Sequence, residues 1–142
     1  MMFRIRQIDH IVLRVSDVQA MLRFYTEVIG CTLELEQHDL GLYQLRAGQS
    51  LIDLVTADGK LGSGGGAPPG SEGLNLDHFC LCIEPFEGER LREWLAAKGA
   101  APSEVARRYG AEGYGPSLYF SDPEGNLVEL YGPLSTAPAP PA

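Results

Sequence analysis

An internal repeat constrains the fold of this chain more than any other feature. Residues 8–15, IDHIVLRV, return as residues 76–83, LDHFCLCI, so an apolar-Asp-His start occurs twice. A second pair of segments, residues 43–53 and 119–129, each opens on a tyrosine and ends on an apolar pair followed by a carboxylate. Because both pairs recur in the same order along the chain, we predict two copies of one structural unit.

In the first copy, the strand that carries the repeat is followed by a predicted helix. Ser16 can cap this helix, with Gln19 at the spacing of a capping box, and apolar residues recur at helical intervals up to a stop at Gly30. Three strands are predicted after the helix, at residues 32–37, 42–46 and 51–55.

The second copy has the same order of elements. Leu91, Trp94 and Leu95 form the apolar stripe of a predicted helix that ends before Gly99, which places Trp94 in the core. Three strands are again predicted, at residues 101–106, 117–121 and 126–131.

The repeated βαβββ order predicts an α+β protein of two tandem modules, whose curved mixed sheets form an open, barrel-like cleft. We predict a single domain over residues 1–134, with module one at 5–57, a glycine-rich linker at 58–74 and module two at 75–133. The tail at 135–142, rich in Pro and Ala, is predicted to be disordered.

Charge and hydropathy exclude two classes of partner. The 142 residues carry 19 acidic and 11 basic side chains, a formal net charge of -8, whereas nucleic acid binding needs clustered Lys and Arg. The apolar stretches are too short for a membrane span, and the first residues lack the pattern of a signal peptide. Three cysteines in a chain without export signals indicate reduced thiols, so we expect a cytoplasmic protein.

Two histidines and two carboxylates occupy matched places in the repeat. His10 and His78 lie in the repeated strands, and Asp53 and Glu129 end the second pair of segments. Since strand side chains alternate between faces, these groups would lie opposite the apolar faces that pack on the helices. Such a set suits one divalent ion: Zn, Ni, Co, Mn or Fe. A structural role for a single histidine is the alternative, but the match in both copies favours a metal site.

Further side chains are candidates for binding a small-molecule substrate. Four are predicted to line the cleft, with ordinary packing as the alternative: Tyr43, Tyr119, Tyr131 and Arg107. Arg107 opens a glycine-rich segment, residues 107–115, which is either a lid over the site or a solvated loop. Cys80 and Cys82 share a face with His78, and we expect them to form part of the cavity wall rather than a soft metal site.

These residues resemble a known family. The chain is similar, over residues 8–133, to the vicinal oxygen chelate superfamily, which includes glyoxalase I, extradiol dioxygenases and the fosfomycin and bleomycin resistance proteins. The resemblance rests on Asp9-His10 with LRVSD at 13–17, Phe24-Tyr25 with Ile29-Gly30, LDH at 76–78, and DPEGN at 122–126 leading to Glu129. It implies the paired-module fold, one divalent metal ion per site and a homodimer, but family members differ in their reactions.

The resemblance also implies roles for individual residues. His10, His78 and Glu129 match the metal ligands that recur across the family, and Asp53 stands where glyoxalase I has its first glutamate. Because the Asp side chain is one methylene shorter, Asp53 would reach the ion either directly or through water. Arg14 matches a glutathione-contacting arginine of bacterial glyoxalase I, which implies a role in substrate binding.

The favoured function is glyoxalase I-like lyase or isomerase chemistry on a substrate that chelates through two neighbouring oxygens. Glu129, with Asp53 as its partner, would move a proton while the metal stabilises an enediolate. A glutathione or other thiol adduct is one substrate class, although Ala57 replaces a second glutathione contact. The alternatives are an extradiol-type dioxygenase and a non-catalytic small-molecule (antibiotic) binding protein. The site would form either within one chain or across a homodimer.

Overall fold

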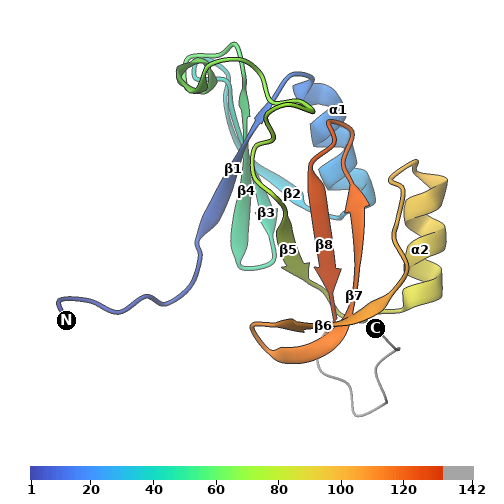
Figure 1. Cartoon of the computed structure of the whole chain (residues 1–142). Helices are drawn as coiled ribbons and strands as arrows, with labels where there is room; N and C mark the ends of the chain where they lie inside the picture. Colours follow the sequence, from blue (N-terminus) through green and yellow to red (C-terminus); the bar gives the residue numbers. More distant parts are fainter. Residues whose placement is uncertain (133–142) are drawn as a thin grey trace. The chain divides into compact units, whose positions relative to one another are not determined.

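Alternating strand residues and one helical segment build each half of the chain. The computed structural model describes residues 1–132, in which one compact unit spans Met1–Asn75 and a second begins at Leu76. Each unit has a four-stranded mixed sheet, so the predicted α+β class with two βαβββ-like modules is confirmed (Figure 1). Neither of the described sheets closes into a barrel. The tail predicted at 135–142 lies outside the described residues.

The sheet of the first unit has the strand order β1-β4-β3-β2, with β1 parallel to β4 and the other neighbours antiparallel. The elements of this unit are β1 (His10–Val15), α1 (Val18–Arg23), the π-helical turn η1 (Phe24–Val28), β2 (Thr32–Gln37), β3 (Leu42–Ala47), β4 (Ser50–Thr56) and the 3-10 turn η2 (Gly62–Gly65). The three strands predicted after the helix are confirmed, and each agrees within one residue at both ends.

The helix of the first unit is capped by Asp17 rather than by Ser16. The Asp17 carboxylate accepts a hydrogen bond from the Ala20 backbone N–H at 3.1 Å. The predicted Ser16 cap is therefore wrong by one residue, because the aspartate fills the same role one position later. Gly30 has a φ of +94° and ends the helical segment as predicted, since this conformation favours glycine.

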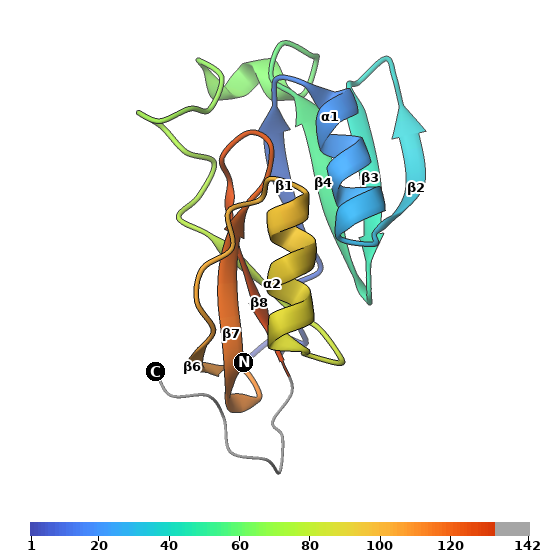
Figure 2. The ribbon, with the colours of Figure 1, turned by 90° about the vertical axis from the view of Figure 1, so that its right-hand side faces the viewer.

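The sheet of the second unit has the equivalent order β5-β8-β7-β6, with β5 parallel to β8. The elements of this unit are β5 (Phe79–Cys82), α2 (Gly88–Ala97), β6 (Ala106–Gly110), β7 (Gly113–Ser121) and β8 (Leu127–Tyr131). In Figures 1 and 2, α1 and α2 each lie along one face of their own unit's sheet. Among residues 1–132, no helix has the length and apolar character that a membrane crossing requires.

The glycine-rich segment at residues 107–115 forms most of a β-hairpin. Tyr109 pairs with Tyr114, and Gly110 pairs with Gly113 at the turn between β6 and β7. The strand predicted at 101–106 is therefore wrong in position, and the segment is a paired hairpin rather than a solvated loop. The physical reason is that Gly113, with a φ of +98°, permits a tight turn at residues 111–112, and this turn pairs the residues on either side of it. The segment's role as a lid over the site stays a prediction.

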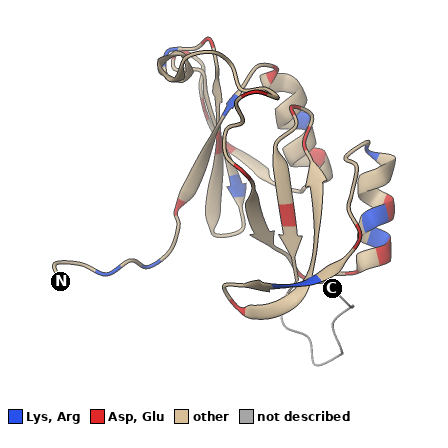
Figure 3. Cartoon of the chain, in the orientation of Figure 1, with Lys and Arg blue, Asp and Glu red and all other residues tan. Residues whose placement is uncertain are grey.

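The predicted core position of Trp94 is wrong. Trp94 is 45% exposed, and the Lys98 ammonium group lies 4.7 Å from the centre of its ring, whereas Leu95 is fully buried. Neighbouring residues of a helix point about 100° apart, so a narrow buried stripe admits only one of the two. The surface of α2 also carries charged residues of both signs (Figure 3).

The core of each unit forms from the strand faces that the alternation predicts. Eight of these side chains are at most 3% exposed: Leu13, Val15, Ile52 and Leu54 in the first unit, and Leu118, Phe120, Val128 and Leu130 in the second. Burying one such side chain stabilises the fold by about 1.5–3 kcal/mol. Because adjacent strand residues point to opposite faces, the same burial turns the histidine and carboxylate positions away from the core.

Candidate metal centre

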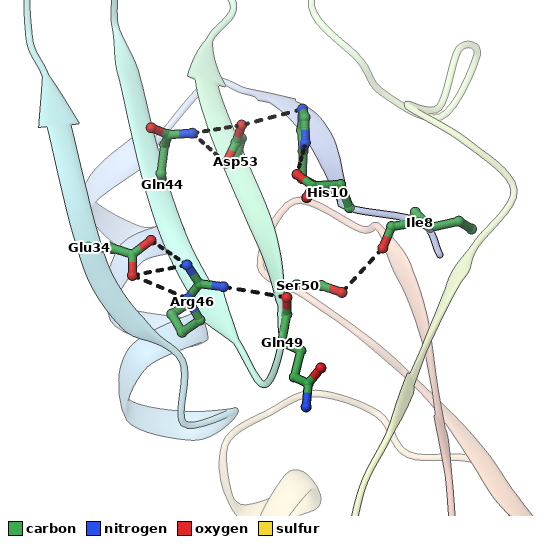
Figure 4. Close-up of polar contacts among 9 residues, drawn as sticks. Ile8, His10, Glu34, Gln44, Arg46, Gln49, Ser50 and Asp53 are labelled. Carbon is green, nitrogen blue, oxygen red and sulfur yellow. Dashed lines mark hydrogen bonds and ion pairs between the residues drawn. The ribbon is translucent and has the colours of Figure 1, made fainter. Parts of the chain in front are cut away.

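In the first unit, the fold brings an imidazole to a buried carboxylate. His10 opens β1, and Asp53 lies in the middle of the parallel strand β4, where Val12 is its register partner. His10 Nε2 lies 4.0 Å from Asp53 Oδ2, and Asp53 is only 4% exposed (Figure 4). The first unit therefore holds one nitrogen donor and one oxygen donor side by side.

A glutamine holds the Asp53 carboxylate from the other side. Gln44 on β3 is the register partner of Asp53, and its amide Nε2 lies 3.3 Å and 3.2 Å from the two carboxylate oxygens (Figure 4). Each oxygen of Asp53 thus accepts a hydrogen bond from the Gln44 amide. This arrangement fixes the carboxylate in place.

The second unit contains the equivalent pair. His78 precedes β5, and its Nε2 lies 3.5 Å from Oε1 of Glu129 on β8. Cys80 on β5 and Tyr119 on β7 are the register partners of Glu129, and the Tyr119 hydroxyl and the Cys80 thiol hydrogen-bond to its carboxylate. The rings of His78 and Tyr119 meet edge to face, with 5.4 Å between their centres.

In both units the far side of the imidazole contacts the preceding aspartate. His10 Nδ1 lies 2.8 Å from the Asp9 carboxylate, and His78 Nδ1 lies 2.5 Å from that of Asp77. An aspartate on Nδ1 favours the tautomer whose free lone pair is on Nε2, the atom that faces the second carboxylate. Metal-binding histidines commonly have this outer partner, which fixes the ring and raises its basicity. The Asp9 hydrogen bond accordingly raises the pKa of His10.

The groups around Glu129 keep their protons at neutral pH. Desolvation and the neighbouring Glu129 charge raise the pKa of the Cys80 thiol to about 12, and desolvation with a Glu112 contact raises that of Cys82 to about 11. Burial, followed by the hydrogen bond to Glu129, also raises the pKa of Tyr119. Cys80 and Tyr119 therefore act as hydrogen-bond donors to the carboxylate. The place of the two cysteines in a cavity wall stays a prediction.

Each unit supplies two ligand atoms and not a complete coordination shell. Within residues 1–132, no group of three or more His, Cys, Asp and Glu side chains is arranged to hold a metal ion. The donors that are present still fit a divalent ion chemically, because they are two imidazole nitrogens and two carboxylates with a combined charge of about -2. A shell of four ligands would need the donors of both units.

The strand register corrects the alignment of the repeated tyrosines. Tyr119 is the register partner of Glu129, but the partner of Asp53 is Gln44, whereas Tyr43 is the partner of Leu54 on the core face. The hairpin turn contains residues 48–49 in the first unit and residues 122–126 in the second, which shifts the register. Tyr43 is 7% exposed, and its hydroxyl lies 3.3 Å from His38 Nδ1.

The other candidates for substrate binding already have contacts within their own unit. The Tyr131 hydroxyl donates to the Gly113 carbonyl at 2.7 Å. The Arg107 guanidinium lies 3.8 Å from the centre of the Tyr114 ring. The Arg14 guanidinium hydrogen-bonds to carbonyls of the glycine-rich segment. Their roles in binding stay predictions, and a ligand would have to share or replace these contacts.

Three residues that contact the histidine–carboxylate pairs are not among the site residues predicted from the sequence. Asp9 and Asp77 contact the histidines, and their presence before both histidines is a signal that could have revealed them. Gln44 has no such signal, because its position opposite Asp53 depends on the length of the hairpin turn.

Comparison with known proteins finds a relative that is similar over most of the chain. The chain is 32% identical over 128 residues to virulence protein STM3117 of Salmonella typhimurium, covering 89% of this chain and 83% of that protein. The crystal structure of STM3117 superposes with a TM-score of 0.75 at 27% identity, covering 93% of this chain and all of the other.

Two more distant structures share the fold at 20% identity. Lactoylglutathione lyase from Agrobacterium tumefaciens matches with a TM-score of 0.63, over 89% of this chain and 92% of that structure. The fosfomycin resistance protein FosX from Listeria monocytogenes matches with a TM-score of 0.66, over 92% and 96%. A family model described as the glyoxalase/bleomycin resistance protein/dioxygenase superfamily matches residues 7–130. The chain, with its repeated βαβββ units, belongs to the glyoxalase/bleomycin resistance protein/dioxygenase superfamily.

Proposed function

We propose that this protein is a metal-dependent enzyme of the glyoxalase I type, a lyase or isomerase that acts on a small substrate with two neighbouring oxygens. One divalent ion (Zn, Ni, Co, Mn or Fe) would be held by His10, Asp53, His78 and Glu129. The observation that carries the proposal is the twofold occurrence of one arrangement, an aspartate on Nδ1 and a buried carboxylate facing Nε2. A purely structural histidine does not require this arrangement in both units.

The bound ion would supply Lewis-acid stabilisation of negative charge on the two substrate oxygens. The protein's own residues would hold and move the proton. Glu129 is the better base of the two carboxylates, since the Tyr119 hydroxyl and the Cys80 thiol donate to its charged form and can rotate to accept a hydrogen bond once it is protonated. Asp53 receives both of its hydrogen bonds from the Gln44 amide and would act mainly as a ligand.

One observation favours a second candidate, extradiol ring cleavage. If Gln44 keeps both Asp53 oxygens occupied, the remaining donors are His10, His78 and Glu129. Two histidines and one carboxylate form the set that binds non-haem Fe(II) in oxygenases with open coordination positions. Non-catalytic capture of a small molecule is the outcome if the protein binds no metal.

Metal analysis tests the proposal directly. Full-length protein is purified without a histidine tag, loaded with each ion and dialysed. By mass spectrometry, it should retain about one ion for each set of four candidate ligands. His78→Ala and Glu129→Ala should lose it. His38→Ala is the matched control, because His38 contacts Tyr43 and Glu36 rather than the candidate ligands. Failure of the wild-type protein to bind any of these ions at micromolar concentration would refute the metal-enzyme proposal.

Two assays on the loaded protein separate the candidate reactions. Isomerisation is measured with methylglyoxal and glutathione, and ring cleavage by catechol-dependent uptake of O₂. Activity in the first supports the lyase or isomerase proposal, and activity in the second supports the dioxygenase. Inactivity of the metal-loaded protein in both assays excludes the glutathione adduct of methylglyoxal and catechol as its substrates.

We also propose a cytoplasmic homodimer in which the two modules and the linker form one domain. The four ligands would then come together within one chain or across two. Mixing inactive His10→Ala and Glu129→Ala proteins distinguishes these cases after subunit exchange. Recovered activity in the mixture shows that ligands are shared between chains, and continued inactivity after confirmed exchange shows that each chain supplies its own four.

A further inference from the structure

The first unit contains a pocket of about 500 Å³, and Asp53, the carboxylate that faces His10, lines it. Its sides are aliphatic side chains of the sheet and residues of the glycine-rich segment: Val12, Leu42 and Val55, and Leu61, Gly62 and Gly65. Among the described residues that line it, Asp53 and Arg14 carry charge. The pocket is therefore apolar over most of its lining and has a candidate metal ligand at its edge.

The Arg14 guanidinium holds the glycine-rich side of this pocket. Its Nε donates to the Gly62 carbonyl at 2.8 Å. One terminal nitrogen donates to the carbonyls of Gly65 and Ala67 at 3.1 Å and 3.0 Å, and the other to that of Gly66 at 2.6 Å. A guanidinium has five N–H groups, so four are engaged and one remains.

The backbone of Arg14 fixes the end of the same segment. The Asn75 amide accepts a hydrogen bond from the Arg14 N–H at 3.0 Å and donates one to the Arg14 carbonyl at 3.0 Å. One residue of β1 thus anchors the segment at residues 62–67 and again at Asn75. The linker predicted from its glycines is an ordered wall at these positions.

The glycines allow this wall to approach closely. A Cβ on Gly65 would lie 2.6 Å from Arg14 Nε, and a Cβ on Gly62 would lie 2.0 Å from the Thr56 carbonyl oxygen. By contrast, a Cβ on Gly64 would meet nothing within 4 Å. Gly62 and Gly65 are therefore needed for the packing of the wall, and Gly64 is not.

The contacts of Arg14 restrict the ligand that the pocket can take. Bidentate recognition of a carboxylate or phosphate needs two parallel N–H groups, and Arg14 has only one left. The remaining lining is aliphatic and favours an uncharged group, which gains free energy as its apolar surface leaves water. Asp53 adds a negative charge that disfavours an anion in the pocket.

We propose that this pocket binds the neutral, apolar end of the substrate, and that Arg14 is a positioning residue that holds the pocket wall. The substrate class is then a small compound with two neighbouring oxygens and an uncharged apolar group, rather than an anionic glutathione adduct. The inference rests on the proposed function for the position of the two oxygens, but the pocket itself can be tested without metal.

The test uses metal-free, full-length, ¹⁵N-labelled protein and two probes, neutral indole and anionic glutathione. Indole should shift the backbone amide signals of residues 61–66 and of the neighbouring β1 and β4 positions in a saturable way. Glutathione should bind there at least tenfold more weakly. Because no metal is present, a failure of the metal-enzyme proposal does not change this result.

Two matched pairs of variants locate the binding. Val12→Phe fills the pocket and should weaken indole binding at least tenfold, whereas Leu35→Phe on β2 should not, although both positions are 48% exposed. Gly65→Ala should weaken indole binding several-fold by displacing the Arg14 guanidinium, and Gly64→Ala should leave it unchanged.

The positioning role of Arg14 is tested by rescue. Arg14→Met removes all four guanidinium hydrogen bonds and should weaken indole binding about as much as Gly65→Ala. Arg14→Lys should retain part of the affinity, since an ammonium group can replace some of the bonds. The proposal is overturned by any of three results: indole causes no saturable shift, glutathione binds at this pocket as tightly as indole, or Val12→Phe behaves like Leu35→Phe.

Discussion

The two units place a carboxylate at the same position in the sheet but surround it differently. Asp53 is held through both oxygens by the Gln44 amide, whereas Glu129 receives hydrogen bonds from the Tyr119 hydroxyl and the Cys80 thiol. An amide N–H group can only donate a hydrogen bond. A hydroxyl or thiol can also accept one, so it can adapt when the carboxylate takes up a proton. A repeated fold can therefore supply matched ligands while its two halves differ in the chemistry that each carboxylate can perform.

The largest effect is expected from replacing the two carboxylates, because their different surroundings predict different losses of activity. Glu129→Gln should lower the turnover number by about 100-fold or more, since removing a general base costs about 10²–10⁴-fold. Asp53→Asn should lower the turnover number markedly less than Glu129→Gln does. Turnover is measured with the substrate that proves active, and the metal content of each variant is determined so that loss of the ion is not mistaken for loss of the base. A larger effect of Asp53→Asn would assign the base to the first unit.

The second prediction concerns the two histidines, for which the comparison implies equal roles. Loss of a residue that hydrogen-bonds to a metal ligand typically weakens metal binding by about 10–100-fold. His10→Ala and His78→Ala remove the ligand itself, so each should weaken metal binding more than that. Competition with a chelator of known affinity measures both. Loss of affinity in only one of the two variants would show that the ligands come from one unit.

The outer aspartates should have a smaller and again equal effect. Asp9→Asn and Asp77→Asn keep a hydrogen-bonding group next to Nδ1 but remove its charge, and each should weaken metal binding by about tenfold. The same competition assay applies, with Asp39→Asn as a control beside the third histidine. Unchanged affinity in both variants would mean that the aspartates do not tune the imidazoles.

The smallest effect concerns a thiol of the second unit. Cys82 has a pKa of about 11, so its reaction with iodoacetamide should be slow at pH 8 and should accelerate by about tenfold per pH unit up to that pKa. Glu112→Gln removes a carboxylate 3.2 Å from the sulfur, which lowers the pKa and should speed the reaction a few-fold at pH 8. A Cys80→Ala background isolates the signal in mass spectrometry. A plateau near neutral pH would contradict the raised pKa.

Most of the fold could be predicted because its signals are local. The three strands after the first helix, the stop at Gly30 and the buried faces all depend on alternation or on one backbone conformation. The first strand after the second helix was predicted too early, at 101–106 instead of 106–110. Two other errors lie where neighbouring residues compete for one role. Asp17 rather than Ser16 caps a helix, and Leu95 rather than Trp94 enters the core.

The sequence identified the two histidines and two carboxylates that lie close together in pairs, but not the residues that contact them. That the four residues bind a metal stays a prediction. His10 and Asp53 come together in the first unit, and His78 and Glu129 in the second, because a parallel strand pair follows from the βαβββ order. Gln44 was not predictable, because the different lengths of the two hairpin turns shift the strand register by one residue. A shift of one residue moves a side chain to the opposite face of a sheet.

The sequence by itself determined the two repeated units, their strand faces and the matched positions of two histidines and two carboxylates on those faces. These features follow from short-range periodicity and from an order of elements that occurs twice. Only the tertiary structure decided what Arg14 does. Its partners lie about fifty residues further along the chain, and the glycines that let them approach act through the packing of the folded unit rather than through any local preference.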